Sequence, residues 1–412
     1  MILITIASLY IITSLLYYLL AWFRGSELRH HSTIKSPIET LITENCGFRV
    51  HSKNSVRLLQ DAGKTYSALI YELQHAKESI HLLYYIFDDD RLGQSISKIL
   101  IRKAHAGIKV RIIYDRFGSL MPRKGVLKRL LKEGVEICAF RPLIFSFIIF
   151  KLTERNHRKL AIIDSRIAFI GGVNIAKRYL DGSELGPWRD MHLRIEGRVV
   201  DDLQSLFLSD WYVVKGERVT PVPPHKPHIG SIRMQILYSE SGKSRHTLYS
   251  AILALFGTAR QQILISTPYF TPPEPHLKSL CRAASMGIRV KLMLPARSDM
   301  RITAAAAESY FEELLNSGVE ILLYNKGFLH TKMVVIDNHY AYIGSANLDY
   351  RSLLNNWEVG TIIYDRGFCR RAANTFSRDS LKCSRLTLEE LKSRPILRRA
   401  AVGLARLLSP ML

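Results

Sequence analysis

The chain has 412 residues, a formal net charge of +22 and five cysteines. The charge indicates an anionic partner, either a lipid surface or nucleic acid. The cysteines are odd in number and widely spaced, with no Cys-x-x-Cys pair, which argues against a disulfide framework and a zinc site. We therefore expect reduced cysteines, no metal ion and no cofactor.

The first predicted element is a transmembrane helix over residues 1–23, followed by a juxtamembrane linker over residues 24–44. No charged side chain occurs from Met1 to Phe23, a length sufficient to span a bilayer. A cleaved signal peptide is the alternative, but its basic first region and small-residue cleavage site are not evident. Basic residues follow the segment and none precedes it, so the positive-inside rule places the rest of the chain in the cytoplasm.

The rest of the chain predicts a duplicated α/β protein. Gly134–Ile137 recurs identically as Gly318–Ile321, and the proline-rich stretch Pro221–Pro227 is the natural linker between two domains, residues 45–220 and 221–412. Apolar strand-like runs alternate with helical stretches, a pattern typical of largely parallel sheets. The strand-like runs are Ile80–Phe87, Val110–Tyr114, Leu160–Ile163, Ile263–Ser266, Val290–Leu294 and Met333–Ile336, and the helical stretches include Ser67–Glu78 and Ile302–Asn316.

One motif occurs once in each half. It consists of a histidine, a lysine two positions later, an aspartate seven positions later and an asparagine 17 positions later. A single copy would be a weak signal, whereas two copies with the same asparagine offset are not coincidental. The residues are His157, Lys159, Asp164 and Asn174 in the first copy and His330, Lys332, Asp337 and Asn347 in the second.

These residue types suit phosphodiester chemistry. Lysine charges and asparagine amides would hold the phosphate oxygens, one neutral imidazole would attack phosphorus, and a second, protonated imidazole would donate to the departing oxygen. Alternation along a strand places each histidine and its lysine on one face. Asp164 and Asp337 fall at strand ends, which indicates structural anchors rather than catalysts. We expect the site between the two domains.

The motif and its surroundings resemble the phospholipase D superfamily and, within it, the bacterial cardiolipin synthases. The resemblance counts Asp164 and Asp337 with the catalytic motif, and it implies that His157 is the nucleophile and His330 the acid and base. Asp190 and Glu358 would orient the two imidazoles, although either could instead be a surface acid. Arg189 and Arg351 are weaker candidates for phosphate binding. The stretches that carry the resemblance are Asn156–Lys159, Gly171–Ile175, Pro187–Asp190, His330–Lys332, Gly344–Ser352 and Asn356–Glu358.

The resemblance implies transfer of a phosphatidyl group between two phosphatidylglycerol molecules through a phosphohistidine, with release of glycerol. Water as the acceptor would make the same machinery a phospholipase D, and a membrane-tethered nuclease or other phosphodiesterase is a further alternative. The predicted N-terminal anchor favours lipid over nucleic acid. The expected partners are phosphatidylglycerol and an anionic membrane surface, and the expected location is the bacterial inner membrane, with a single span. The oligomeric state is not predicted.

Two further segments invite membrane hypotheses. Leu143–Phe150 is an apolar run that only the first half contains, and it predicts either a buried strand or an element that dips into the membrane and admits the lipid beside His157. Pro395–Leu412 mixes arginines with leucines. It predicts either a basic amphipathic helix on the membrane or a helix packed on the second domain.

Overall fold

The structure is a computed structural model that describes residues 38–46, 48–119, 125–140, 154–220, 230–240 and 246–412. The predicted transmembrane helix, the apolar run Leu143–Phe150 and the linker Pro221–Pro227 lie outside the described residues. Within them, no helix combines the length and the apolar character that crossing a bilayer requires.

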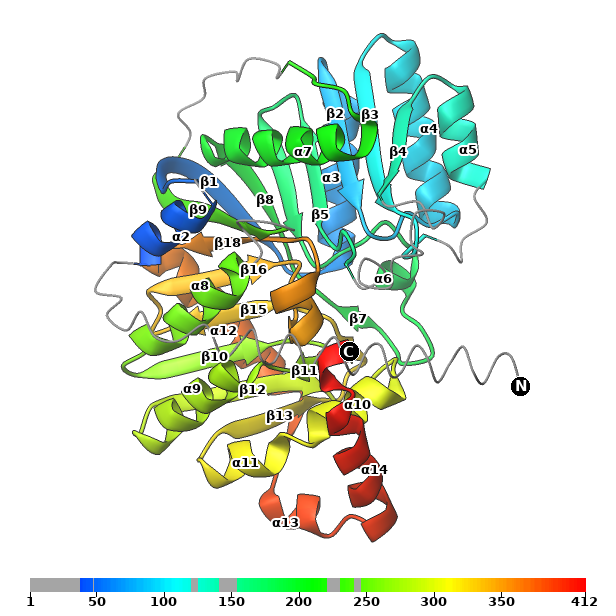
Figure 1. The fold of residues 1–412 in the computed structure, drawn as a ribbon. Helices are drawn as coiled ribbons and strands as arrows, with labels where there is room; N and C mark the ends of the chain where they lie inside the picture. Colours follow the sequence, from blue (N-terminus) through cyan, green and yellow to red (C-terminus); the bar gives the residue numbers. More distant parts are fainter. Residues whose placement is uncertain (1–37, 47, 120–124, 141–153, 221–229, 241–245) are drawn as a thin grey trace.

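A continuous sheet of fifteen strands runs through the described part of the molecule (Figure 1). Its order is β19-β13-β12-β10-β15-β16-β18-β9-β1-β8-β6-β5-β2-β3-β4. Two small pairs, β11 with β17 and β14 with β7, lie outside it. The strands are β1 (His51–Leu59), β2 (Ser79–Tyr84), β3 (Lys109–Asp115), β4 (Glu136–Phe140), β5 (Lys159–Ile163), β6 (Ile167–Gly171), β7 (Trp188–Arg189), β8 (His192–Gly197), β9 (Ile232–Ser239), β10 (Gln262–Ser266), β11 (Phe270–Thr271), β12 (Arg289–Pro295), β13 (Glu320–Tyr324), β14 (Phe328–Leu329), β15 (Met333–Ile336), β16 (Tyr340–Gly344), β17 (Leu348–Asp349), β18 (Glu358–Ile363) and β19 (Cys383–Leu386).

The prediction of a largely parallel sheet is wrong, because most neighbouring strands of the large sheet are antiparallel. Within the large sheet of the described residues, only β2–β3, β3–β4, β10–β12 and β12–β13 pair in parallel. Helical crossovers connect these strands, whereas β5 and β6 are joined by a tight turn that forces an antiparallel pair. Two strands joined by a short turn run in opposite directions, whereas two strands joined by a helical crossover run in the same direction. The type of connection therefore decides whether the pair is antiparallel or parallel.

The two halves repeat one strand order and meet at the antiparallel pair of β1 and β9. From this junction the first half runs β1-β8-β6-β5-β2-β3-β4 and the second runs β9-β18-β16-β15-β10-β12-β13, so that each of these strands has a counterpart, and β19 adds one further strand to the end of the second half. The predicted strands are confirmed as β2, β3, β5, β10, β12 and β15, although β2 ends earlier than expected. The duplication seen in the motif therefore extends to the topology of the sheet.

Helices cover both faces of the sheet. Side chains of α3, α4 and α5 join the core of the first half, and those of α8, α9 and α11 join the core of the second. A third core contains residues of both α7 and α12 and of strands from both halves. The helices are α2 (Ile38–Cys46), α3 (Ala62–His75), α4 (Arg91–His105), α5 (Gly125–Lys132), α6 (Arg178–Asp181), α7 (Val199–Lys215), α8 (Thr247–Thr258), α9 (Glu274–Ser285), α10 (Arg301–Glu308), α11 (Phe311–Asn316), α12 (Arg366–Ser380), α13 (Leu388–Lys392) and α14 (Ile396–Leu407), with a π-helix, η3 (Arg351–Asn355), and a 3₁₀ turn, η4 (Ser409–Met411).

Local signals explain where several helices begin and end. The Asp61 side chain caps α3 by accepting from the Lys64 amide, as expected for an N-cap aspartate. The helical stretch expected over Ile302–Asn316 is divided into α10 and α11. Ser309 follows α10, and its hydroxyl donates to the Ala306 carbonyl at 2.6 Å, a local bond that competes with the helical pattern.

Candidate active site

The backbone places each motif histidine beside a strand of the other half. His157 precedes β5, and its amide donates to the Trp357 carbonyl at 2.8 Å. His330 precedes β15, and its amide donates to the Arg189 carbonyl at 2.8 Å. The residues after Trp357 and Arg189 are Glu358 and Asp190, so the register of these contacts brings a carboxylate of one half to the histidine of the other.

The side chains complete this crossed arrangement. Nδ1 of His157 lies 2.9 Å from Oε1 of Glu358, and Nδ1 of His330 lies 2.6 Å from Oδ2 of Asp190. Both carboxylates are buried. Although burial opposes ionisation, the neighbouring imidazole and lysine hold the pKa of each carboxyl below its ordinary value. An ionised carboxylate accepts a hydrogen bond from Nδ1–H, which fixes the tautomer and leaves Nε2 with its lone pair.

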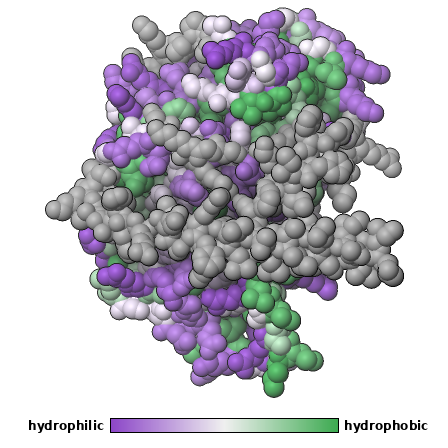
Figure 2. All heavy atoms as spheres, in the orientation of Figure 1, coloured by the Kyte–Doolittle hydropathy of each residue, from purple (hydrophilic) through white to green (hydrophobic). Residues whose placement is uncertain are grey.

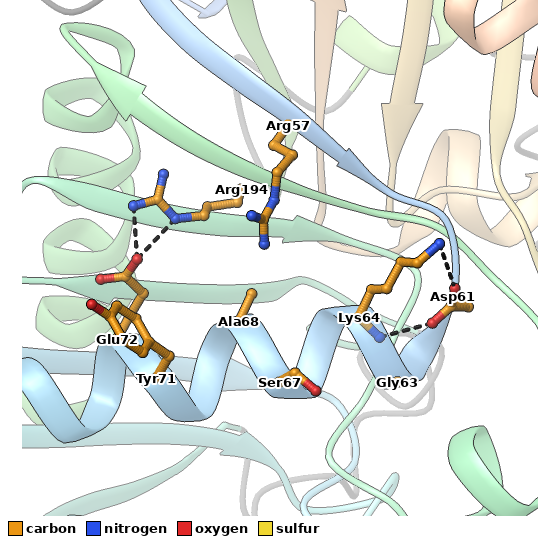
Figure 3. Close-up of a pocket in the computed structure, with 9 residues that line it drawn as sticks. All are labelled: Arg57, Asp61, Gly63, Lys64, Ser67, Ala68, Tyr71, Glu72 and Arg194. Carbon is orange, nitrogen blue, oxygen red and sulfur yellow. Dashed lines mark hydrogen bonds and ion pairs between the residues drawn. The ribbon is translucent and has the colours of Figure 1, made fainter.

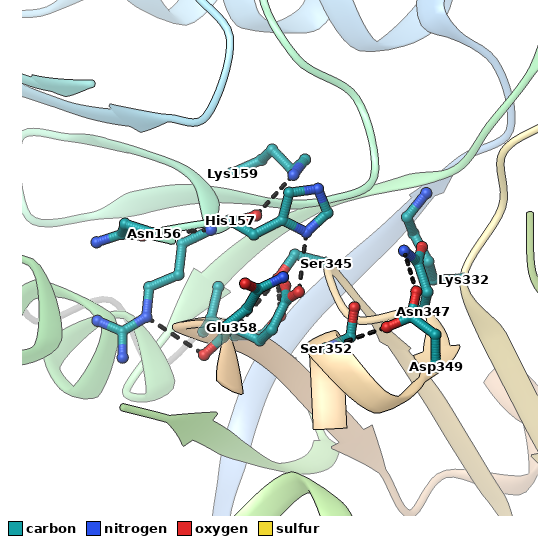
Figure 4. A network of polar contacts seen from close by, with 12 residues as sticks. Asn156, His157, Lys159, Lys332, Ser345, Asn347, Asp349, Ser352 and Glu358 are labelled. Carbon is teal, nitrogen blue, oxygen red and sulfur yellow. Dashed lines mark hydrogen bonds and ion pairs between the residues drawn. The ribbon is translucent and has the colours of Figure 1, made fainter. Parts of the chain in front are cut away.

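The two motif lysines are buried and close enough to act on each other. Lys159 Nζ donates to the His157 carbonyl at 2.6 Å (Figure 4). Lys332 Nζ donates to the His330 carbonyl at 2.5 Å. Burial lowers the pKa of Lys332 to about 8, against the pull of Asp190 and Glu358. Burial also lowers the pKa of Lys159 well below its ordinary value, and the charge of Lys332 adds to that shift. Two desolvated cations at one place favour an anion between them.

Both imidazoles are neutral at pH 7 in the free protein. Burial lowers the pKa of His157 to about 4, although Glu358 opposes the shift. Burial and then the charge of Lys332 lower the pKa of His330 to about 3. The side chain of His157 keeps 15% of its surface exposed and that of His330 keeps 9%. His157 is therefore the more accessible of two uncharged imidazoles.

The motif asparagines lie close to the same centre but are held by different partners. Asn174 Oδ1 accepts from the Ile86 amide at 3.1 Å, and its Nδ2 lies 2.6 Å from the Tyr179 hydroxyl. Asn347 Nδ2 donates to Asp349 Oδ2 at 2.9 Å. An amide Nδ2 carries two protons, so each asparagine keeps one donor beyond these contacts. Phosphate binding by the pair stays a prediction.

The motif aspartates lie at the far ends of their strands from the histidines. Asp164 follows β5, has a φ of 53° and accepts from three consecutive backbone amides, those of residues 77–79, at the start of β2. Asp337 follows β15, has a φ of 51° and accepts from the amides of residues 260–262, at the start of β10. In both halves the aspartate joins the motif strand to its neighbour, which is the contact pattern of an anchor.

We expect Asp164→Ala to lower stability and leave catalysis nearly intact. The substitution leaves three amides without their carboxylate, a loss of about 2–3 kcal/mol in the free energy of unfolding. Urea unfolding measures this change, and kcat per folded molecule should stay within about threefold of wild type. Asp164→Asn, which keeps one acceptor oxygen, is the matched control and should lose less stability. A loss of kcat comparable to that of a motif histidine would make Asp164 a catalytic residue instead.

Several residues of the site were not singled out from the sequence. Aromatic rings surround both imidazoles: the Tyr85 ring lies 5.0 Å from the His157 ring, and Trp188 lies 5.2 Å from His330 between centroids. Arg158, inside the first motif, is fully buried and forms an ion pair with Asp210. The second motif has the uncharged Thr331 at the position of Arg158. This difference was the one signal in the sequence for the ion pair.

Arg189, a weaker candidate from the sequence, has a structural partner. Its guanidinium pairs with the Asp379 carboxylate, at 2.7 Å from Nη2 to Oδ2. Arg351 forms no ion pair with another described residue, and its charge acts on the pKa of Tyr85, so it lies on the side of His157. A role in binding phosphate therefore suits Arg351 better than Arg189.

A separate pocket lies on the first half, between β1 and α3 (Figure 3). The Arg194 guanidinium in this pocket is bound to Glu72, and Lys64 Nζ lies 3.4 Å from Asp61 Oδ2. None of the motif residues lines it. The basic side chains of this pocket are thus partly neutralised, and the pocket is distinct from the histidine centre.

Comparison with known proteins gives matches that include both motifs. A family model described as "Cardiolipin synthase, PLD-like domain" matches residues 69–211 and 252–380. The cardiolipin synthase of Geobacillus kaustophilus is 38% identical over 360 residues, which cover 86% of this chain and 72% of that protein. The major cardiolipin synthase of Bacillus subtilis is 36% identical over 364 residues, covering 87% of this chain and 76% of that protein.

Among solved structures, a phosphatidylserine synthase of Haemophilus influenzae superposes with a TM-score of 0.71 at 17% sequence identity. The match covers 91% of this chain and all of that protein. At this identity the similarity establishes the fold alone.

Proposed function

Because the chain belongs to the cardiolipin synthase family of phospholipase D-like proteins, we propose that it transfers a phosphatidyl group from one phosphatidylglycerol to another and releases glycerol. The observation that supports this most is the crossed pair of histidine–carboxylate contacts beside two buried lysines. A nucleophile, a proton carrier and cations for the phosphate oxygens are the groups that a phosphodiester exchange needs.

In the first step, Nε2 of His157 attacks the phosphorus of one phosphatidylglycerol. The bond from phosphorus to the headgroup glycerol oxygen breaks, and Nε2 of His330 donates a proton to that oxygen. Glu358 holds Nδ1–H of His157 and stabilises the positive imidazole ring that forms. Lys159, Lys332, Asn174 and Asn347 bind the non-bridging oxygens.

In the second step, a second phosphatidylglycerol presents its headgroup hydroxyl. Nε2 of His330 removes the hydroxyl proton, and the alkoxide oxygen attacks phosphorus. The bond from phosphorus to His157 breaks, and cardiolipin leaves. Asp190 stabilises His330 whenever His330 is protonated, because its carboxylate lies 2.6 Å from Nδ1.

The acid role of His330 depends on the substrate. In the free protein its pKa is about 3, because of burial and the charge of Lys332. A bound phosphate carries a negative charge that offsets the lysine charges, so its binding raises the pKa of His330. Proton delivery is thereby linked to an occupied site.

The pH dependence of KM should report the ionisation of Lys332. Lys332 is charged below its pKa of about 8 and loses its charge above it, so KM for phosphatidylglycerol should rise up to about tenfold per pH unit above pH 8. Because kcat reports the occupied site, kcat should change less over this range. Steady-state kinetics from pH 7 to pH 10 measure both.

Lys332→Arg is the control for this pH effect, because an arginine stays charged throughout the range. The variant should bind less well at pH 7, yet its KM should not rise further above pH 8. A rise of KM that persists in the variant would assign the ionisation to another group.

The central test incubates the purified full-length protein with phosphatidylglycerol vesicles and a chelator and identifies the products by mass. Cardiolipin with free glycerol supports the proposal, and undiminished turnover in the chelator supports the expected absence of a metal. Phosphatidic acid as the main product would make the protein a hydrolase. An absence of lipid turnover, together with cleavage of DNA, would overturn lipid chemistry altogether.

The location and domain boundaries complete the proposal. A transmembrane helix over residues 1–23, with the catalytic part in the cytoplasm of a bacterium, would hold the site at its lipid substrate. The domains would divide at residues 220 and 221, between the end of α7 and the start of β9. The family match to two separate segments supports a division in this region.

A further inference from the structure

Helix α14 packs on the second half by its polar side. Arg398 Nη2 lies 2.9 Å from Glu308 Oε2, at the end of α10. Arg406 Nη1 donates to the Ser309 carbonyl at 3.2 Å. Ala405 is buried on this same side of the helix. The arginines thus attach the helix to the domain.

The apolar side of α14 faces away from the domain. Ile396, Leu397, Leu404 and Leu407, which we call the outer leucine row, are exposed to 81%, 85%, 66% and 72%. At 3.6 residues per turn these positions fall within about 100° of one another, on one side of the helix. Figure 2 shows hydrophobic residues gathered over this helix, at the lower tip of the molecule. A helix of a water-soluble protein normally buries such a row. In α14 the polar side packs on the domain and the apolar side faces the solvent instead.

Two further exposed apolar side chains lie at the start of α10. Helix α10 packs against α14, and Met300 and Ile302 at its start are 48% and 42% exposed. The adjacent Asp299 accepts from the Tyr269 hydroxyl at 2.8 Å, and its charge acts on the pKa of Lys332. The start of α10 therefore lies near enough to the histidine centre for Asp299 to act on Lys332, and the same helix contacts α14.

We propose that the outer leucine row, with Met300 and Ile302, inserts into the interfacial layer of an anionic lipid bilayer and seats the active site on it. Exposed Arg301 and Arg399 belong to the same two helices, and the chain as a whole carries +22. Basic residues beside an apolar helix face suit the headgroups of anionic lipids, whose charge they complement. The part of this proposal that concerns substrate delivery rests on the proposed function, whereas the binding itself does not.

Hydrogen–deuterium exchange of residues 396–407 tests the binding in the full-length protein, alone and with phosphatidylglycerol vesicles. We expect exchange in α14 to slow at least tenfold with these vesicles, and to slow less with neutral phosphatidylcholine vesicles. The test variant is Leu397→Gln/Leu404→Gln/Leu407→Gln, which keeps helix propensity and should lose the protection. The matched control, Leu131→Gln/Met286→Gln/Leu381→Gln, removes three side chains that are 60%, 71% and 85% exposed elsewhere and should keep it.

Turnover supplies the second measurement. On phosphatidylglycerol vesicles the test variant should lose at least tenfold in rate, whereas on monomeric short-chain phosphatidylglycerol it should match wild type. If vesicles slow exchange in α14 of the wild type but the protein turns over no lipid, the proposed function is wrong and the proposed membrane surface is still supported.

Three results would overturn the membrane surface. The first is hydrogen exchange in α14 of the wild type that does not change when vesicles are added. The second is an equal loss of protection in the test variant and in the control variant. The third is slow exchange of α14 in the absence of vesicles. This slow exchange would either increase with protein concentration or disappear when residues 1–37 are deleted. A second copy of the chain or the N-terminal segment would then cover the row instead.

Discussion

Replacing His157 with alanine should lower kcat for phosphatidyl transfer by on the order of 10⁴-fold or more. The variant loses the atom that would bond to phosphorus, and no other described imidazole has the same access. His330 is directed at the same centre but is less exposed and is more strongly disfavoured as a cation. Initial rates of cardiolipin formation from phosphatidylglycerol vesicles measure the loss.

Folding and lipid binding should survive this substitution. His157 contributes one side-chain hydrogen bond, to the buried Glu358, which keeps its bond from the Ser345 hydroxyl. Its removal should therefore cost about 1–3 kcal/mol of stability and leave the protein folded at the pH of the assay. Glu358→Gln is the matched partner variant, because it keeps the volume and removes the charge that fixes the tautomer. We expect it to lower kcat by about 10²–10⁴-fold.

A chemical quench with phosphorus-labelled short-chain phosphatidylglycerol identifies the nucleophile directly. Wild type should carry the label on His157, and His157→Ala should carry none. A label on His330 in wild type would reverse the two roles. Full activity of His157→Ala would remove the phosphohistidine from the mechanism.

Replacing Arg158 with methionine should lower the free energy of unfolding by about 3–5 kcal/mol. Arg158 is fully buried, pairs with Asp210 and lies 3.3 Å from Glu240. Its Nε donates to the Glu358 carbonyl at 3.2 Å, and its Nη2 donates to the Ser239 carbonyl at 2.9 Å. One side chain thereby joins the motif of the first half to α7 and to strands on the other side of the junction.

The cost arises chiefly from the partner that remains. Without Arg158, the Asp210 carboxylate is buried with the Asn156 amide, 3.1 Å away, and the burial that already raises the pKa of Asp210 is no longer opposed by a cation. Replacing both residues, as Arg158→Met/Asp210→Leu, should recover at least half of the loss, because a buried apolar pair needs no counter-charge.

Urea unfolding of the full-length protein measures these differences. Arg385, which is exposed in β19, supplies the control, and Arg385→Met should change stability by less than about 0.5 kcal/mol. A change below about 1 kcal/mol for Arg158→Met, or a double variant no more stable than the single one, would contradict the structural role of the ion pair.

The sequence predicted the elements that depend on local patterns. The apolar runs after each motif became β5 and β15, and the aspartates after them stand at positive φ in tight turns. Short polar side chains tolerate that conformation, so motif, strand and turn can be found without tertiary information. The direction of the strands could not be found in this way, because it depends on the path of each connection through space.

By itself, the sequence predicted the side chains that we propose for the site: two histidines, two lysines and two asparagines at one spacing, with Asp190 and Glu358 as candidate acceptors. Only the tertiary structure decided that each carboxylate crosses to the histidine of the other half, over 201 residues in one case and 140 in the other. It also decided that α14 packs by its arginines and exposes its leucines. Local spacing shows that a helix has two sides, but the side that packs depends on which partner the rest of the fold presents, here Glu308 and Ser309.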